Sequence, residues 1–584
     1  MGNILGIAGS HNGGVALYIP ERNTIEVIEV ERLLNIKNAA YATYNPAIDP
    51  NECTQLIKAY VKKHFNVDKF DVVRSISSDF DNRHVAYDYD FDIFEHNTQR
   101  FDKDGNVLES SSDTGMCSGD GWAAYHHKSH AANTFYQSNF EDALVFSFDG
   151  GGDDGWFLGY HFDKTKPKNE QVKTIHFSFR DMGSPYFFLG YFIDDIDYIM
   201  DWGEACLTYA GKLMGYCSYG DVRDEWYQPV KEYYNRWIRE GWRPVENEAY
   251  DILTKLSEQT GLKFDWLTYD DGAKVPSGKN RLQGKDAYDL IATSQKVFED
   301  IFFDEVRQYI DLYKTNVCIT GGCAMNILNN TKIREYVQKN YNKDVFVAPN
   351  SSDCGLAAGL VLDQLRPDQP IDLTYSGMDI LDKDSYPKML KIDKLYHEDV
   401  DLSKLVSEIK LSGFIFGLVQ GKSEHGPRAL GNRSIICSPK EGMKDTLNLK
   451  VKGREFYRPF APVCRLEDVS KFFEWEGESK HMNYAAIVKD EYREDLASIT
   501  HNDNTARIQT VTREQNRFLY DLLSEMDKNN ITPVLLNTSF NVAGKPILNS
   551  YEDALTVLNN TEMDGLVIIN EYTKENGKLF FKAR

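Results

Sequence analysis

The sequence predicts a mixed α/β protein with at least two domains, and three observations support this prediction. The chain has 584 residues, 42% hydrophobic and 27% charged, whereas a single hydrophobic core stops growing at about 250–300 residues. Several short β-branched or aromatic runs are each followed by Gly- or Asn-rich punctuation and then by strand- or helix-compatible sequence. Residues 366–399 carry three prolines and many charges, and a new series of strand-like runs follows them. In such architectures ligands bind at the carboxyl ends of strands.

The elements of the first series follow one another along residues 1–365. The expected strands are 4–7, 143–148, 316–320 and 345–348. After the first two, polar Gly-rich turns at 10–14 and 149–153 lead into further strand-like sequence, which predicts hairpins whose N–H groups suit phosphate. After the other two, helices are expected at 323–330 and 354–365.

The second series begins with the strand-like run 414–419, and we place the domain boundary near residue 395. The predicted domains are therefore 1–394 and 395–584. Residues 85–120 are acidic and Ser/Gly-rich, which indicates an insertion or a long surface loop.

Composition restricts the class of protein. The formal net charge is −23, which disfavours a duplex-coating role without excluding a local basic groove. No apolar run approaches the ~18 residues of a membrane span, and no signal-peptide pattern is present. Nine cysteines are scattered without a C-x-x-C pair, so neither a disulfide framework nor a zinc ribbon is indicated. We expect a cytoplasmic protein that does not contact a membrane.

The sharpest local feature is the histidine-rich segment 125–132. On a helix, His126 and His130 project from one face four residues apart, so that both imidazoles can bind one metal ion. A carboxylate completes such a site, and Asp149 closes a predicted strand shortly afterwards. The alternative is a pair of ordinary histidines. His127, one step around the helix, can replace either ligand or support one.

Two Gly-rich segments and one acidic residue offer further contacts. The turn 149–153 is either a plain hairpin turn or a metal- and phosphate-binding turn whose glycines admit close backbone approach. The segment 321–326 opens a helix and can present N–H groups to a nucleotide. Asp353 begins another predicted helix, where it is either an N-cap or a metal ligand.

Arginines gather in a second strong segment, 421–434, and in the stretch 448–460 that follows. Guanidinium groups beside Gly and Pro turns suit polyphosphate and carboxylate recognition. A solvated basic face is the alternative, but the Gly and Pro punctuation fits it poorly. Arg507 and the polar strand end 536–541 add another cation and further hydrogen-bonding groups.

Taken in this order, these segments resemble the NodU/CmcH-type O-carbamoyltransferases from residue 4 to about residue 554. The most specific stretches are HGPRALGNRS at 425–434, REFYRPFAP at 454–462 and LLNTSFN at 535–541. The resemblance implies an actin-like ATPase (ASKHA) fold, as in threonylcarbamoyl transferases, for the first domain. It implies a YrdC-like α/β fold for the second.

The resemblance also implies a two-stage, ATP-dependent reaction. The second domain forms carbamoyl adenylate from carbamoyl phosphate and ATP, with Mg²⁺ accompanying the nucleotide. The first domain then transfers the carbamoyl group to an acceptor hydroxyl with the help of a divalent metal such as Fe²⁺.

Motif matching assigns residues to these roles. The implied metal ligands are His126, His130, Asp149 and Asp353. The residues implied to hold carbamoyl adenylate are Gly150, Gly151, Lys212, Gly321, Gly322 and Asn326. Those implied to hold ATP and carbamoyl phosphate are Arg428, Asn432, Arg433, Ser434, Lys452, Arg458, Arg507, Asn537 and Ser539. Lys37 matches a lysine that follows the family's Glu-Arg segment, and we place it with His11 and Asn12 in the catalytic group.

The chain departs from the family at Asn12, at His425, and at Ala543 and Lys545, where the common pattern has Arg and Glu. Asn12 stands where most members have an aspartate after the histidine, and an amide cannot take a proton. If that aspartate is the usual base, another group must serve here, and His11 is the candidate. His425 stands where the family favours tryptophan.

Two other functions and several partners stay open. An actin-fold ATPase or sugar kinase would use the Gly-rich turns but would not need the arginine-rich block. A nucleotide-bound scaffold, in which Asn12 marks lost catalysis, is the third reading. The acceptor is either a small-molecule or sugar hydroxyl, or a hydroxymethylated pyrimidine in DNA. Homodimer formation is also left open.

Overall fold

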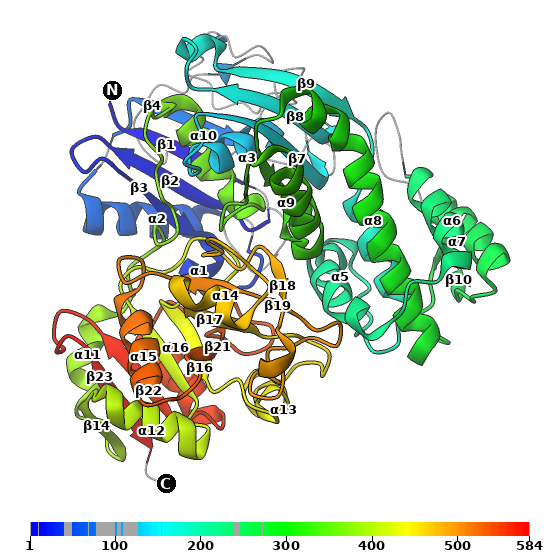
Figure 1. Ribbon diagram of the computed structural model, residues 1–584. Helices are drawn as coiled ribbons and strands as arrows, with labels where there is room; N and C mark the ends of the chain where they lie inside the picture. Colours follow the sequence, from blue (N-terminus) through cyan, green and yellow to red (C-terminus); the bar gives the residue numbers. More distant parts are fainter. Residues whose placement is uncertain are drawn as a thin grey trace. The chain divides into compact units, whose positions relative to one another are not determined.

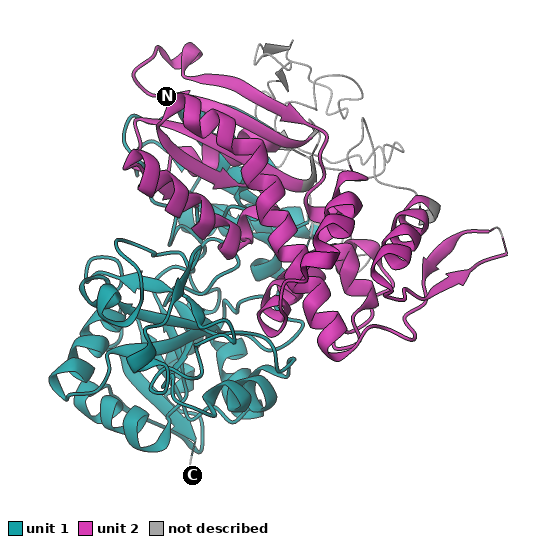
Figure 2. Cartoon of the chain, turned by 45° about the vertical axis from the view of Figure 1, so that its right-hand side comes forward, with its two compact units in different colours: residues 1–122, 348–584 teal, residues 123–347 magenta. Residues whose placement is uncertain are grey.

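The computed structural model describes residues 2–9, 11–39, 50–67, 69–76, 100–101, 107–108, 126–152, 155–237, 246–270 and 272–582. The chain divides into two compact units, one of residues 1–122 with 348–584 and one of residues 123–347 (Figure 2). Apart from the short antiparallel pair β5 (Arg100–Phe101) and β6 (Val107–Leu108), the predicted insertion at 85–120 lies outside the described residues.

The first unit begins with a four-stranded sheet of order β3-β2-β1-β4 (Figure 1). Its strands are β1 (Ile4–Ala8), β2 (Gly14–Ile19), β3 (Thr24–Glu29) and β4 (Val72–Ile76). The first three form antiparallel hairpins, of which the Gly-rich turn at 10–14 predicts the one between β1 and β2, and β4 runs parallel to β1.

Helices cover both faces of this sheet. Successive side chains of a strand point to opposite faces, so neighbouring residues of β1 pack against different helices. Leu5 and Ile7 pack in one hydrophobic cluster with helix α2 (Pro50–Phe65). Gly6 faces α10 (Leu356–Leu365), where a Cβ would lie 2.2 Å from the Ala357 carbonyl oxygen. A fully buried β1 therefore reads as a continuous apolar run.

The second unit contains a five-stranded sheet of order β13-β12-β7-β8-β9. Its strands are β7 (Asp142–Gly152), β8 (Gly155–Asp163), β9 (Val172–Ser178), β12 (Asn316–Thr320) and β13 (Val345–Phe346). The predicted hairpin is confirmed in β7–β8, and β12 runs parallel to β7. The carboxyl ends of β7 and β12 therefore meet at one edge of the sheet, where helix α3 (His126–Phe135) packs against both strands.

The rest of the second unit is largely helical. It includes α5 (Trp202–Tyr216), the long α8 (Gly284–Tyr313) and α9 (Ile327–Tyr341). The helix expected from residue 323 is a short 3₁₀ turn, Gly322–Met325, followed directly by α9. Among the described helices, none is both long enough and apolar enough to cross a membrane.

The first unit also holds an eight-stranded mixed sheet whose strands all come from residues 395–582. In order across the sheet they are β14 (Leu395–Asp399), β23 (Lys578–Lys582), β22 (Gly565–Ile569), β15 (Phe416–Gln420), β16 (Arg433–Cys437), β21 (Val534–Ser539), β17 (Ala461–Arg465) and β20 (Gln509–Val511). Helices α12 (Leu402–Ser412) and α15 (Arg517–Lys528) pack on it in one hydrophobic cluster.

The mixed α/β class is thus confirmed. The ASKHA and YrdC-like assignments and the boundary at residue 395 stay predictions.

Candidate metal and anion sites

Two histidines and one aspartate meet in the second unit, as the sequence predicts. His126 and His130 project from α3 one turn apart, and their ring centroids are 4.7 Å from each other. Each presents Nε2 to Asp149 Oδ2, at 3.8 Å from His126 and 3.4 Å from His130. Both imidazoles are buried, and Asp149 is half-buried. We call these three residues the histidine–aspartate cluster.

Neighbouring backbone fixes the carboxylate of this cluster. Gly322 N donates to Asp149 Oδ2 at 2.7 Å, which joins the ends of β7 and β12. Gly321 has φ +88°, and a Cβ there would lie 2.2 Å from the Phe148 carbonyl oxygen, so only glycine fits this close approach. His127 is turned aside, with its Nδ1 2.8 Å from Ser147 Oγ.

The electrostatics keep Asp149 ionised. Burial opposes the charged form, but the neighbouring imidazoles of His126 and His130 outweigh it and hold the pKa of Asp149 well below its usual range. A deprotonated carboxylate is the form that binds a cation.

The donor set of the cluster fits a divalent metal. One ligand atom from each of the three residues lies within 4.8 Å of the others, and ligands of one tetrahedral ion at ~2.1 Å stand about 3.4 Å apart. Two imidazoles and one carboxylate suit Zn²⁺ and also the open facial sites of non-haem Fe²⁺.

Asp353, the fourth predicted ligand, belongs to the first unit. It begins the 3₁₀ turn Asp353–Gly355 and is buried. Its Oδ2 lies 3.3 Å from His11 Nε2, so the predicted catalytic histidine and Asp353 are direct neighbours.

Asn12 lies on the other side of His11. Its Nδ2 donates to Glu31 Oε2 at 3.2 Å and to Asn38 Oδ1 at 3.4 Å, and its Oδ1 faces His11 Nδ1 at 3.2 Å. Two acceptors on the amide nitrogen fix the orientation of the amide, which therefore presents its oxygen to the imidazole. A residue at φ +55° favours Asn.

The residues predicted to hold carbamoyl adenylate lie on several different elements of the second unit. Gly150 and Gly151 continue β7 beyond Asp149. Asn326 caps α9 and exchanges two 3.0 Å hydrogen bonds with Gln295. Lys212 is buried on α5, with its Nζ 3.7 Å from Asp197 Oδ2. Of this set, Gly321 and Gly322 reach the histidine–aspartate cluster.

Five cations gather in the first unit, at Arg428, Lys452, Arg454, Arg458 and Arg507, and we call them the cation cluster. Burial and the charge of Arg458 lower the pKa of Arg428 to about 10 and that of Arg454 to about 9. Burial, followed by the charges of Arg428, Arg454 and Arg458, lowers the pKa of Arg507. Mutual lowering of this kind requires the groups to be near one another.

Lys452 is the most enclosed member of the cation cluster. It is buried at the end of the π-helical turn Leu447–Lys452. Its Nζ donates to Ser539 Oγ at 3.2 Å, to the Ser539 carbonyl at 2.6 Å and to Asn541 Oδ1 at 2.5 Å. Burial and then the charges of Arg454, Arg458 and the exposed Lys37 lower its pKa.

Other predicted phosphate contacts have structural partners. The buried Arg433 guanidinium donates to the carbonyls of Gln420 and Gly421 and to Asn549 Oδ1, which favours a structural role over phosphate contact. Three further residues also have partners within the protein. Asn432 donates to the Lys422 carbonyl, Ser434 Oγ accepts from Gly431 N, and Asn537 donates to Gln509 in β20.

Sequence reasoning missed a buried carboxylate that shapes this region. Glu424 Oε1 accepts from the backbone N–H groups of Leu430, Asn432 and Arg433, at 2.7, 2.7 and 3.0 Å. It thereby folds residues 424–433 into a compact loop that carries Arg428. The only available signal was a glutamate placed directly before the HGPRALGNRS stretch.

Comparison with known proteins identifies the family. The model described as "Carbamoyltransferase N-terminus" matches residues 114–362, and the one described as "Carbamoyltransferase C-terminus" matches residues 408–575. The nodulation protein NolO of Bradyrhizobium diazoefficiens is 32% identical over 465 residues, which cover 76% of this chain and 77% of that protein.

Two further comparisons are weaker. A 3'-hydroxymethylcephem-O-carbamoyltransferase of Streptomyces clavuligerus is 32% identical over 371 residues, covering 63% of this chain and 65% of that enzyme. The crystal structure of T. kodakarensis HypF covers 62% of this chain and 47% of its own at 13% identity and a TM-score of 0.30, which identifies no shared fold. The two family models and the NolO match together establish that the chain belongs to the carbamoyltransferase family and is an enzyme.

Proposed function

We propose that the enzyme is an ATP-dependent O-carbamoyltransferase that works through carbamoyl adenylate. In the first stage carbamoyl phosphate, ATP and one water give carbamoyl adenylate, phosphate and pyrophosphate. In the second stage an acceptor oxygen bonds to the carbamoyl carbon, the bond to AMP breaks, and AMP leaves with the electron pair. The hydroxyl proton passes to a base.

The cation cluster is the observation that carries this proposal. Five basic side chains are held together in a chain of net charge −23, and four of them are arginines. Their repulsion disfavours the ligand-free state, so a bound polyphosphate that relieves it is favoured. ATP and carbamoyl phosphate are anions of this class, and the Lys452–Ser539 contact places a hydroxyl beside the cations.

The histidine–aspartate cluster supports the transfer stage. A divalent metal held by His126, His130 and Asp149 would supply Lewis-acid polarisation of the carbamoyl oxygen, and we propose Fe²⁺ for that role and Asp353 as a further ligand. His11 lies between Asp353 and the fixed amide of Asn12. Its Nδ1 hydrogen is donated to the Asn12 oxygen, so Nε2 carries the lone pair, and we propose that nitrogen as the base for the acceptor, with Asp353 stabilising the imidazolium that forms. Of the two glycines beside the cluster, Gly321 then offers its N–H group to the adenylate, because the Gly322 N–H already donates to Asp149.

For the acceptor we propose a hydroxymethyl or sugar hydroxyl on a small molecule. One relative is named for a hydroxymethyl acceptor, and the net charge of this chain opposes a polyanionic acceptor. A hydroxymethylated pyrimidine in DNA is the second candidate.

The products of ATP test the proposal. Purified enzyme with Mg²⁺, Fe²⁺, ATP and carbamoyl phosphate should release pyrophosphate, and adding a competent acceptor should yield AMP and a product heavier by one carbamoyl group. The acceptor panel includes hydroxymethylated cephems, sugars and hydroxymethylcytosine DNA. Release of ADP with a phosphorylated acceptor would instead identify a kinase.

A further inference from the structure

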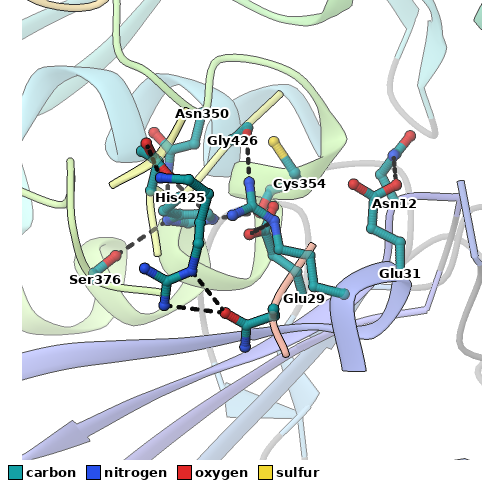
Figure 3. A network of polar contacts seen from close by, with 12 residues as sticks. Asn12, Glu29, Glu31, Asn350, Cys354, Ser376, His425 and Gly426 are labelled. Carbon is teal, nitrogen blue, oxygen red and sulfur yellow. Dashed lines mark hydrogen bonds and ion pairs between the residues drawn. The ribbon is translucent and has the colours of Figure 1, made fainter. Parts of the chain in front are cut away.

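His425 lies at the junction of three segments of the first unit (Figure 3). Its side chain is fully buried. Its Nε2 lies 2.8 Å from the Cys354 carbonyl oxygen, and its Nδ1 lies 2.9 Å from Asn350 Nδ2 and 3.3 Å from Ser376 Oγ. One ring therefore ties residues 350–354 and residue 376 to the start of the 424–433 loop.

The partners of the ring determine its hydrogen positions. A carbonyl only accepts and an amide NH₂ only donates, so Nε2 carries the hydrogen and Nδ1 is the acceptor. Burial lowers the pKa of His425 to about 4, in the presence of the nearby charge of Arg32. The imidazole is thus neutral at physiological pH, and both of its nitrogens are engaged.

The anchored carbonyl belongs to the residue directly after Asp353. Asp353 starts the turn that Cys354 continues, and its carboxylate contacts His11. A shift of the Cys354 peptide would therefore move Asp353 away from His11. The tie is tight, because a Cβ on the next residue of the loop, Gly426, would lie 2.3 Å from the Pro349 carbonyl oxygen.

The same loop also contacts the turn of Asn12. The Gly426 carbonyl accepts a 2.5 Å hydrogen bond from Arg32, whose Nε is paired with Glu29 at 2.9 Å. Arg32 follows Glu31, the residue that holds the Asn12 amide. The loop thus positions His11 from two sides, through Asp353 and through Asn12.

We infer that His425 is a positioning residue for carbamoyl transfer, acting through the Cys354 peptide to hold Asp353 against His11. This inference rests on the proposed two-stage function. Because Glu424 binds the backbone of residues 430–433 and so closes the loop that carries Arg428, the loop also connects the cation cluster to the Asp353 turn. The hydrogen bonds of the His425 ring, rather than its volume, position Asp353.

Two substitutions separate hydrogen bonding from packing. His425→Gln keeps one N–H donor for Cys354 and one oxygen acceptor for Asn350, whereas His425→Phe keeps a ring of similar size with neither. Pyrophosphate release from ATP and carbamoyl phosphate reports the first stage. The kcat and KM for the acceptor, measured at saturating ATP and carbamoyl phosphate, report the second.

We expect His425→Phe to lower the transfer kcat by about 10–100-fold, the range found when residues that orient metal-site ligands are lost. Pyrophosphate release should stay within about threefold, and His425→Gln should restore most of the transfer rate. Asn350→Leu removes the donor to His425 Nδ1 and should give the same selective loss of transfer. This variant tests the inference independently if His425→Phe folds poorly.

Three outcomes would overturn the inference. They are an unchanged transfer kcat in both the Phe and Leu variants, an equal loss of both stages, and a Gln variant as impaired as the Phe variant. A wild-type enzyme that forms neither pyrophosphate nor carbamoylated product would overturn the proposed function, and this inference with it. A wild type that completes both stages while the variants match it overturns the role of His425 alone.

Discussion

At the scale of single residues, Asn12 has its amide held by a carboxylate. Its Nδ2 donates to Glu31 Oε2 at 3.2 Å. Asn12→Asp would replace this donor with an oxygen facing a second carboxylate. We expect the free energy of unfolding at pH 7 to fall by about 1–3 kcal/mol, and the loss to shrink at pH 4–5, where one carboxyl is protonated.

Urea denaturation of the variant at both pH values measures this effect. The matched control is the double variant Asn12→Asp/Glu31→Gln, which restores a donor opposite the new carboxylate and should recover most of the stability. An equally unstable double variant would contradict the explanation by charge.

The histidine–aspartate cluster makes a second prediction at this scale. His126→Ala or His130→Ala should weaken binding of Fe²⁺ or Zn²⁺ by at least about 10–100-fold, because each removes one of three side-chain ligands. Transfer should be abolished and pyrophosphate release largely kept. Titration calorimetry of the apo-protein reads the affinity. His161→Ala, in the same sheet but paired with Asp142, should bind metal like the wild type.

The pKa of His425 gives a pH prediction. The folded value of about 4 lies below the ordinary 6.5, so between these values the unfolded chain binds more protons than the folded one. Stability then falls as the pH drops from about 6.5 toward 4, by about 2 kcal/mol at pH 5 from this residue. Comparing His425→Gln with the wild type by urea unfolding at pH 7 and 5 isolates this share, and equal pH dependence would refute it.

At the scale of elements, the loops that carry the cation cluster hold like charges close together. This lowers the stability of the ligand-free protein and favours the binding of anions. Arg428→Gln removes one of several like charges, so the ligand-free protein should unfold no more easily than the wild type. Pyrophosphate release should fall by at least ~100-fold, because a charge-assisted contact to phosphate is lost. The rise in Tm with ATP should also shrink. Arg513→Gln breaks a surface pair with Asp521 and should change none of these.

Element positions follow from the sequence where the signal is local. The strand at Ile4–Ala8, the helix of His126 and the β7–β8 hairpin are confirmed, because apolar runs, helical spacing and Gly turns act over a few residues. The meeting of Asp149 with the two histidines also follows, since parallel strand ends and i, i+4 spacing fix it.

Contacts between distant residues could not be predicted in this way. His425 meets residues 49 to 75 positions away, and Arg32 meets Gly426 across 394 positions. No periodicity marks such partners. Likewise, the sequence shows that Arg433 is a cation beside glycines but not that its guanidinium is occupied by backbone carbonyls. The arginine-rich segments predicted the charges of the cation cluster, whereas the fold was needed to show which neighbouring cations are bonded to the surrounding backbone instead.

At the scale of the whole molecule, net charge bears on the acceptor. A chain of charge −23 repels a polyanion, so we expect kcat/KM for the proposed uncharged acceptor to change less than about twofold between 50 and 200 mM salt. A DNA acceptor held by 6–10 phosphate contacts would lose about 10³–10⁵ in affinity over that range. Initial rates at several salt concentrations distinguish the two, and a steep decline would favour DNA.

The packing of Gly6 against Ala357 has a consequence for how the protein is made. Strand β1 buries one face under a helix that is synthesised some 350 residues later. During translation that apolar face of β1 stays exposed until α10 has been synthesised, and closing so large a loop is slow. Nascent chains halted before residue 356 should therefore be cleaved readily in and around β1 by added protease. Chains extended past residue 365 and clear of the exit tunnel should resist it.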